Sequence, residues 1–350
     1  MQRSYNPSYN RNLTRRTYRP IKKAIKTRKS IGQKLGNVTK FIDPETNDIV
    51  DIRTNREKVK SILIHNLKKS NRINIKNIVP PKQCGNNCWF NVLFLCYFIS
   101  DKGRRFTKPL RQLMITGDVD KRLVDNSKLS QLTEGLFLLN LAIEATLTGV
   151  SFTQNINTNE IISTIYDSFK NPYSWTYNKG YGNPLVYYEG LVRFLYTNNS
   201  YPIQSYDMTN IVFSQREILS NYTFTPNIIN NKEIYPHMLI ITIDDNTSSI
   251  ISNRPSVIKF TNSKKKKTIK YKLDSICIRD IDKSHVGCLI NLNKCGFFFD
   301  ADGPQQNRMS PKRWLNKNFL SSNRNFTRGK DYATFNIRNG YQILYYFRDS

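Results

Sequence analysis

The chain has 350 residues, of which 39% are hydrophobic and 12% aromatic; this composition indicates a folded core and excludes a largely disordered protein. The formal net charge of +28 favours binding to polyanions such as nucleic acid or acidic membrane. There is no run of about 18 or more uncharged apolar residues, so no membrane span is expected, and the first residues lack the apolar segment of a secretory signal.

The first predicted unit is a disordered basic tail at residues 1–42. It contains twelve Lys or Arg and no Asp or Glu, and such a block of like charges repels itself and stays solvated. We expect the tail to bind nucleic acid or another polyanion; the alternative is a solvating tail without specific contacts. A second basic run, Lys264–Lys267, is interpreted as the tip of a hairpin between two strands.

A connecting segment is predicted at residues 43–80, before a single domain at residues 81–350. Within the connecting segment, NREKVKSILIHNLKK predicts a helix over residues 55–69. The IVPPK sequence at 78–82 interrupts this pattern, because paired prolines cannot continue a helix.

The first part of the domain, residues 81–200, is predicted to be helical. WFNVLFLCYFI is apolar almost all round, which predicts a helix over 88–99 that runs through a core. Apolar residues at three- and four-residue spacing predict further helices in LSQLTEGLFLLNLAIEATLTG, NEIISTIYDSFK and YYEGLVRFLYT. Residues 201–350 instead contain short runs typical of strands: HMLIITI, SVIKF, TIKYKL, SICIRDI, VGCLINL, GFFFD and YQILYYF. Helices followed by strands indicate an α+β fold.

The six cysteines contain no CxxC pair, which argues against a zinc ribbon or finger. No metal or other cofactor is expected. Without a secretory signal, reduced thiols and a cytoplasmic or nuclear location are expected. The cysteines are Cys84, Cys88, Cys96, Cys277, Cys288 and Cys295.

Cys88 is the candidate nucleophile. It lies in the first turn of the predicted helix, where the helix dipole and free backbone N–H groups favour a thiolate. Cys96, two turns deeper in the same apolar helix, is interpreted as a packing residue. The alternative for Cys88 is also an inert, buried thiol.

A catalytic thiol needs a base, and the chain has three histidines. His65 lies in a basic helix, and His237 is interpreted as structural. His285 is the candidate base, because it precedes a strand whose hairpin partner is followed by Asp300 and Asp302. A carboxylate opposite the imidazole would fix its tautomer and stabilise the imidazolium; the alternative is a coincidental surface pair.

The register of that hairpin decides which carboxylate faces His285. A turn centred between Leu292 and Asn293 places Asp300 opposite His285. A turn centred one residue later places Asp302 there instead. Gln83, five residues before Cys88, could donate to an oxyanion together with the Cys88 backbone N–H.

These residues resemble the ubiquitin-specific proteases. GNNCWFN at 85–91 is similar to the family's cysteine box, Gly-Asn-Thr-Cys-aromatic-apolar-Asn, with Asn87 in place of Thr and Gln83 in place of the oxyanion Asn. The segment 271–291 resembles the Tyr-x-Leu strand and the histidine box, and GFFFD matches the aromatic ending that favours Asp300. The family's zinc-binding CxxC pairs are absent from the chain.

The resemblance implies a papain-like fold, in which helices carry the cysteine and an antiparallel sheet carries His and Asp. It implies a thiol-dependent deubiquitinase that cleaves after the C-terminal glycine of ubiquitin or a ubiquitin-like protein. Cys88 would be the nucleophile, His285 the base, Asp300 the orienting acid and Gln83 the oxyanion donor. Trp89 and Asp302 would contact substrate.

Two alternatives remain. Papain itself has a similar box, Gln…Cys-Gly-x-Cys-Trp, but orients its histidine with an Asn, and the FFFDAD ending favours the ubiquitin-specific type. The other alternative is a non-enzymatic structural or packaging protein, such as a component of a viral particle, whose tail binds nucleic acid. Both roles can hold together if the tail locates the enzyme.

Overall fold

The computed structural model describes the core of the predicted domain and part of the connecting segment. In this part of the chain, no helix is long and apolar enough to cross a membrane. The predicted tail up to residue 39 and the predicted helix YYEGLVRFLYT lie outside the described residues. The described residues are 40–43, 46–52, 54–69, 73–81, 83–116, 126–149, 157–169, 210–214, 227–229, 232–234, 237–243, 255–262, 267–282, 285–300, 310–311, 320, 325–327, 333–337 and 342–349.

The helices precede the main sheet in the chain. The predicted apolar helix over 88–99 is confirmed as one continuous helix, whose second half, η2, is π-helical. All its residues from the second onward are buried, because nearly all are apolar. The helices are α2 (Arg56–Lys68), η1 (Ile75–Asn77), α3 (Cys88–Phe94), η2 (Leu95–Ile99), α4 (Asp101–Phe106), α5 (Lys108–Thr116), α6 (Asn126–Thr148) and α7 (Thr158–Phe169).

The strands form one large sheet and three two-stranded ribbons. The large sheet has the order β11-β10-β9-β8-β14-β6-β3, and β7 pairs with β8. Its pairs are antiparallel except β3–β6, which is parallel and departs from the predicted all-antiparallel sheet. The strands are β1 (Lys40–Ile42), β2 (Ile49–Asp51), β3 (Asn210–Ser214), β4 (Asn227–Ile229), β5 (Lys232–Ile234), β6 (Met238–Ile243), β7 (Val257–Asn262), β8 (Lys267–Arg279), β9 (Val286–Leu292), β10 (Cys295–Phe299), β11 (Ser310–Pro311), β12 (Asn325–Thr327), β13 (Thr334–Asn336) and β14 (Gln342–Arg348).

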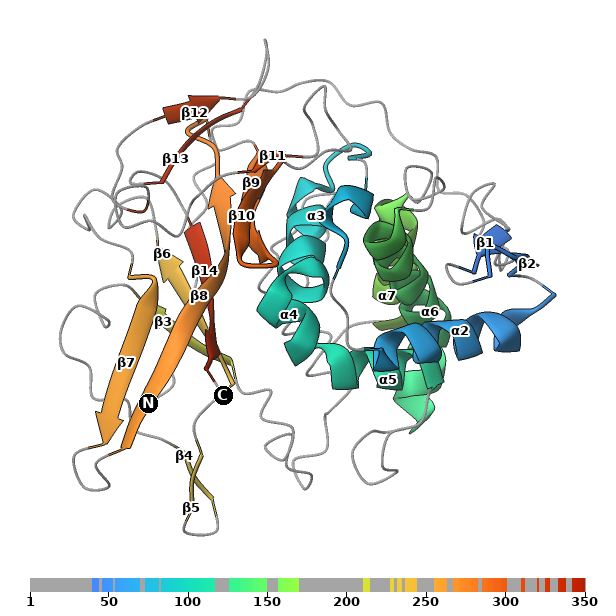
Figure 1. The fold of residues 1–350 in the computed structure, drawn as a ribbon, viewed down its shortest axis with the longest axis horizontal. Coiled ribbons are helices and arrows are strands. Elements are labelled where there is room, and N and C mark those ends of the chain that lie inside the picture. Colours follow the sequence, from blue (N-terminus) through green and yellow to red (C-terminus); the bar gives the residue numbers. More distant parts are fainter. Residues whose placement is uncertain are drawn as a thin grey trace.

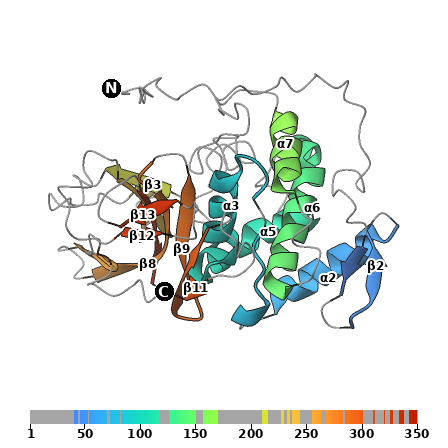
Figure 2. The same ribbon diagram turned by 90° about the horizontal axis from the view of Figure 1, so that it is seen from above.

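The predicted α+β architecture is confirmed. Figure 1 shows the sheet on one side, the helices α6 and α7 on the other, and α3 between them; the view from above agrees (Figure 2). The main core lies between the helices and one face of the sheet, and a second apolar cluster covers the other face. The strands β6, β9, β10 and β14 are almost continuously apolar because nearly all of their residues, on both faces of the sheet, are buried.

Two boundaries differ from the sequence prediction. Strand β1 pairs with β2 and begins at Lys40, so the last three residues assigned to the disordered tail belong to a ribbon. Of the basic run predicted as a hairpin tip, residues 264–266 lie outside the described residues, and Lys267 is the first residue of β8, which pairs antiparallel with β7.

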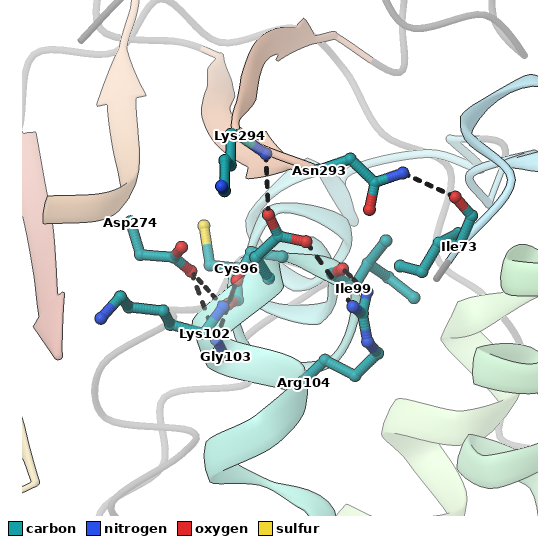
Figure 3. A network of polar contacts seen from close by, with 11 residues as sticks. Ile73, Cys96, Ile99, Lys102, Gly103, Arg104, Asp274, Asn293 and Lys294 are labelled. Atoms are coloured by element: carbon teal, nitrogen blue, oxygen red, sulfur yellow. Dashed lines mark hydrogen bonds and ion pairs between the residues drawn. The ribbon is translucent and has the colours of Figure 1, made fainter. Parts of the chain in front are cut away.

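Polar contacts hold the sheet against the start of α4. The buried carboxylate of Asp274, in β8, accepts hydrogen bonds from the backbone N–H groups of Lys102 at 3.1 Å and Gly103 at 3.2 Å (Figure 3). The N–H of Lys294, in the turn after β9, donates to Asp101 Oδ2 at 3.2 Å. The first turn of α4 is therefore satisfied by groups from the sheet, which fixes the sheet relative to the helix that carries Cys88.

Gly103 allows this close approach. A Cβ at this position would lie 2.1 Å from the carbonyl oxygen of Cys96 and 2.5 Å from Ser100 Oγ. Any side chain would therefore push α4 away from η2, and the contacts with Asp274 would be lost with it.

Candidate active site

Cys88 is the first residue of α3. The helix begins there because the carbonyl oxygen of Asn87 accepts from the N–H groups of Phe90 and Asn91, each at 3.1 Å. Cys88 is partly exposed, whereas every later residue of α3 and η2 is buried. The thiol is therefore the side chain of this helix that solvent reaches, and it lies at the positive end of the helix dipole.

His285 contacts Asp300 and lies beside Cys88. Its Nε2 lies 2.6 Å from Asp300 Oδ1, and Cys88 is close enough to help raise the pKa of the imidazole. Because Asp300 engages Nε2, Nδ1 is the ring nitrogen left for the thiol. His285 is 8% exposed and Asp300 2%, so this is a buried pair and not a coincidental one on the surface.

The pKa of His285 reflects this environment. Burial alone lowers it, but the hydrogen bonds to Asp300 and Cys88 and the attraction of their charges outweigh burial and raise the pKa to about 10. His285 is therefore protonated at neutral pH.

The hairpin that carries His285 and Asp300 has a two-residue turn. Asn293 and Lys294 both have positive φ, 48° and 65°, as the turns favoured in two-residue hairpins require. Leu292 pairs with Cys295 on either side of them. The turn is thus centred between Asn293 and Lys294.

This register is the one for which the sequence predicts Asp302 opposite His285. The ladder, however, ends at the pair Cys288 and Phe299, and Asp300 reaches the imidazole from the diagonal position. The premise that the acid must stand directly opposite the histidine is therefore wrong. The carboxylate in contact is Asp300, as the family resemblance favours; Asp302 lies outside the described residues.

Asp280 holds the backbone of His285. Its N–H donates to the His285 carbonyl oxygen at 2.9 Å, and its Oδ1 accepts from the His285 N–H at 2.9 Å. Asp280 is buried at the end of β8, so these bonds close the loop before β9. Sequence reasoning missed Asp280; the available signal was a carboxylate five residues before the histidine in a short loop.

Gln83 lies in the loop that leads into α3. Its Oε1 is buried, and no described residue donates a hydrogen bond to it. The loop turns at Gly85, whose φ of +66° is favoured by glycine. A role of Gln83 as an oxyanion donor stays a prediction.

Other predicted residues have packing positions. Trp89 is 4% exposed and meets Phe90 edge to face at 5.8 Å, so its side chain belongs to the core, and contact with substrate stays a prediction. His237 accepts a backbone hydrogen bond from Arg348 at 2.8 Å, and Arg348 Nη2 lies 2.9 Å from its Nε2, in agreement with its structural interpretation. His65 is exposed on α2.

Cysteines other than Cys88 do not form a metal site. Cys277 and Cys288 face each other across β8 and β9, and both are buried together with Cys96. Within the described part of the chain, no group of three or more His, Cys, Asp or Glu side chains could hold a metal ion.

No protein-family model and no curated protein matches the chain. Solved structures of the SAGA DUB module are similar to it at 9% sequence identity. The structure with Ubp8, Sgf11, Sus1 and Sgf73 bound to monoubiquitin gives a TM-score of 0.47 and covers 87% of this chain and 77% of that chain. The Ubp8-Sgf11-Sgf73-Sus1 module gives 0.42, with 87% and 76% covered, and a yeast module with a mutant Sgf73 gives 0.35, with 87% and 77% covered.

Proposed function

We propose that the protein is a thiol-dependent hydrolase with Cys88 as its nucleophile. The observation that carries the proposal is the buried pair of His285 Nε2 and Asp300 Oδ1 at 2.6 Å beside the partly exposed thiol of Cys88. A partly exposed thiol at a helix start, an imidazole beside it and a buried carboxylate behind the imidazole are the parts that nucleophilic catalysis requires.

Each residue has a defined step in the proposed reaction. The Cys88 thiolate attacks the carbonyl carbon, and the electron pair of the carbonyl moves onto oxygen. The Cys88 N–H and the Gln83 amide stabilise this oxyanion. When the C–N bond breaks, His285 gives its proton to the leaving amine. Water then attacks the thioester and gives a proton to His285, and the C–S bond breaks. Asp300 keeps the imidazole oriented throughout.

Within this class, we propose a deubiquitinase that cleaves after the C-terminal glycine of ubiquitin or a ubiquitin-like protein. The cysteine box at 85–91, the histidine box ending at residue 291 and the GFFFD ending support this substrate. A Gly-Gly tail has no side chains, so it can approach a thiol that is only partly exposed. The free thiol that the reaction needs fits a reducing compartment such as the cytoplasm or nucleus.

The test uses the full chain and ubiquitin with a propargylamide at its C-terminus. Wild-type protein is expected to form a covalent adduct, and peptide mapping should place it on Cys88. Cys88→Ala should form none, whereas the matched variant Cys295→Ala, which removes an exposed thiol elsewhere, should react as the wild type does. Folded wild-type protein that forms no adduct would contradict the deubiquitinase.

A second candidate role is suggested by charge. The twelve Lys or Arg in residues 1–42, without an acid, support a tail that binds nucleic acid or another polyanion, as in a structural or packaging component of a particle. The test is removal of residues 1–39, which spares strand β1. Binding to a DNA duplex should weaken steeply with salt in the full chain and be largely lost in the truncated one; equal binding by both would reject this role.

A further inference from the structure

A buried hydroxyl links the helix that carries Cys88 to the start of α7. Asn87 Nδ2 donates to Thr158 Oγ1 at 2.7 Å, and Thr158 Oγ1 donates to Asn91 Oδ1 at 2.8 Å. All three side chains are fully buried. Because a hydroxyl has one hydrogen, donation to Asn91 leaves Thr158 as the acceptor for Asn87 and sets the orientation of the Asn87 amide.

The orientation of Asn87 matters for the loop before Cys88. Its Oδ1 accepts from the Cys84 N–H at 3.0 Å, and the Cys84 carbonyl oxygen accepts from Asn159 Nδ2 at 2.6 Å. Both polar groups of the Cys84 backbone are thus held by side chains. Thr158 and Asn159, neighbours at the start of α7, hold this loop directly or through Asn87.

Packing does not fix the middle of this loop. A Cβ built on Gly85 would meet no atom within 4 Å, so the turn at Gly85 lies in open space. The loop has Gln83 at one end and Cys88 at the other, the two residues assigned to the oxyanion. Its polar contacts are therefore the restraint on the distance between the two oxyanion donors.

We infer that Thr158 and Asn159 are positioning residues for oxyanion stabilisation, acting through Asn87 and Cys84. The inference rests on the proposed function. Thr158→Val keeps the shape of the side chain but removes the acceptor for Asn87 and the donor for Asn91, so the amide of Asn87 is free to turn and release Cys84. Thr158→Ser keeps both hydrogen bonds.

Two reactions of Cys88 separate this role from a merely structural one. Acylation by p-nitrophenyl acetate passes through an oxyanion and releases p-nitrophenol, whereas alkylation by iodoacetamide displaces iodide and forms no oxyanion. Loss of an oxyanion donor lowers rates by about 100-fold to 1,000-fold, so loosening the loop should cost about 10-fold to 100-fold. Thr158→Val should lower acylation by that factor and leave the alkylation rate of Cys88 within about 2-fold, and Thr158→Ser should restore acylation.

Asn159→Ala provides a second variant at a half-buried position, in case Thr158→Val does not fold. It removes the donor to the Cys84 carbonyl and should likewise lower the acylation rate of Cys88 while leaving the alkylation rate unchanged. Unchanged acylation in either folded variant overturns the inference, and so does an equal fall of acylation and alkylation, which would mean a structural role. Both reactions are independent of ubiquitin. If the variants show lower acylation with unchanged alkylation but the wild type cleaves no ubiquitin amide, the deubiquitinase is rejected and the positioning residues are kept.

Discussion

Cys88 and Cys96 lie on the same continuous helix, formed by α3 and η2, but they have different surroundings. Cys88 is partly exposed and lies close enough to His285 to affect the pKa of the imidazole. Cys96 is 1% exposed and lies close to Cys288, another buried thiol. The two cysteines share a residue type and a helix, so position along the helix and the group that the sheet places opposite decide what each thiol can do.

The thiols around Cys96 show the effect of burial. Burial is the main cause that raises the pKa of Cys277 and of Cys288 well above the usual value of a thiol. These groups stay protonated and therefore unreactive. Cys88 is therefore partly exposed beside His285, whereas the thiols around Cys96, eight residues further along the helix, are buried.

The largest expected effect is the difference in alkylation rate between Cys88 and the buried cysteines. In native protein, iodoacetamide should modify Cys88 at least about 1,000-fold faster than Cys96, Cys277 or Cys288, because buried thiols react only when the protein opens. Peptide mapping over time measures the individual rates, and the exposed Cys295 is the control for access alone. Rapid modification of Cys96 in folded protein would contradict the comparison.

Removal of the Asp300 carboxylate should strongly lower the hydrolysis proposed for Cys88. Asp300→Asn keeps the size of the side chain but removes the charge that helps raise the pKa of His285. Hydrolysis of a ubiquitin C-terminal amide should fall by about 100-fold to 10,000-fold. The control is Asp282→Asn, an exposed carboxylate in the same loop region, which should retain activity. Equal activity of Asp300→Asn and wild type would remove Asp300 from the site.

The raised pKa of His285 predicts a dependence of stability on pH. The pKa is about 10 in the folded state and about 6.5 in an unfolded chain. The resulting stabilisation is fully present below about pH 6.5 and is lost as pH rises through about 10. Urea midpoints should therefore fall more between pH 7 and pH 10.5 for wild type than for His285→Gln. Parallel curves for the two proteins would show that the contacts with Asp300 and Cys88 do not stabilise the imidazolium.

Much of the fold could be predicted from local patterns. The apolar helix over 88–99 and the strands β6, β9, β10 and β14 follow from apolar runs whose turns and polar ends are clear in the sequence. One strand, β8, was predicted as two runs on either side of Asp274. A carboxylate between two apolar runs predicts the end of a strand, but the carboxylate of Asp274 accepts hydrogen bonds from the N–H groups of α4. Local patterns cannot show that such a distant partner exists.

The site could be predicted less completely. The short search among three histidines and the resemblance to the cysteine and histidine boxes pointed to Cys88, His285 and Asp300. The supporting residues Asp280 and Thr158 were missed. Thr158 lies 71 residues from Asn87 in sequence, and its position depends on how α7 packs against α3. The order of the strands also depends on contacts between distant segments, because β14, at the end of the chain, lies between β8 and β6.

The smallest expected effect concerns Asp274, which accepts hydrogen bonds from the start of α4, directly after the end of η2. Burial, the largest cause, raises the pKa of Asp274 to about 6 despite the hydrogen bonds that it accepts from the Gly103 and Lys102 N–H groups. The contribution of Asp274 to stability is therefore full below about pH 3.9 and is lost as pH rises through about 6. Asp274→Asn keeps an acceptor for the two N–H groups without a charge to bury.

Asp274→Asn should accordingly raise the free energy of unfolding at pH 7.5 by about 1–2 kcal/mol and flatten its dependence on pH between 4 and 7. Urea unfolding of both proteins across this range measures the difference. Alkylation of Cys88 should be unchanged, because Asp274 restrains α4 and η2 at the buried end and leaves the contact of Cys88 with His285 intact. A variant that is less stable at pH 7.5 would contradict this prediction. It would mean that the ionised carboxylate of Asp274, despite its burial, is a stronger acceptor than an amide for the N–H groups of α4.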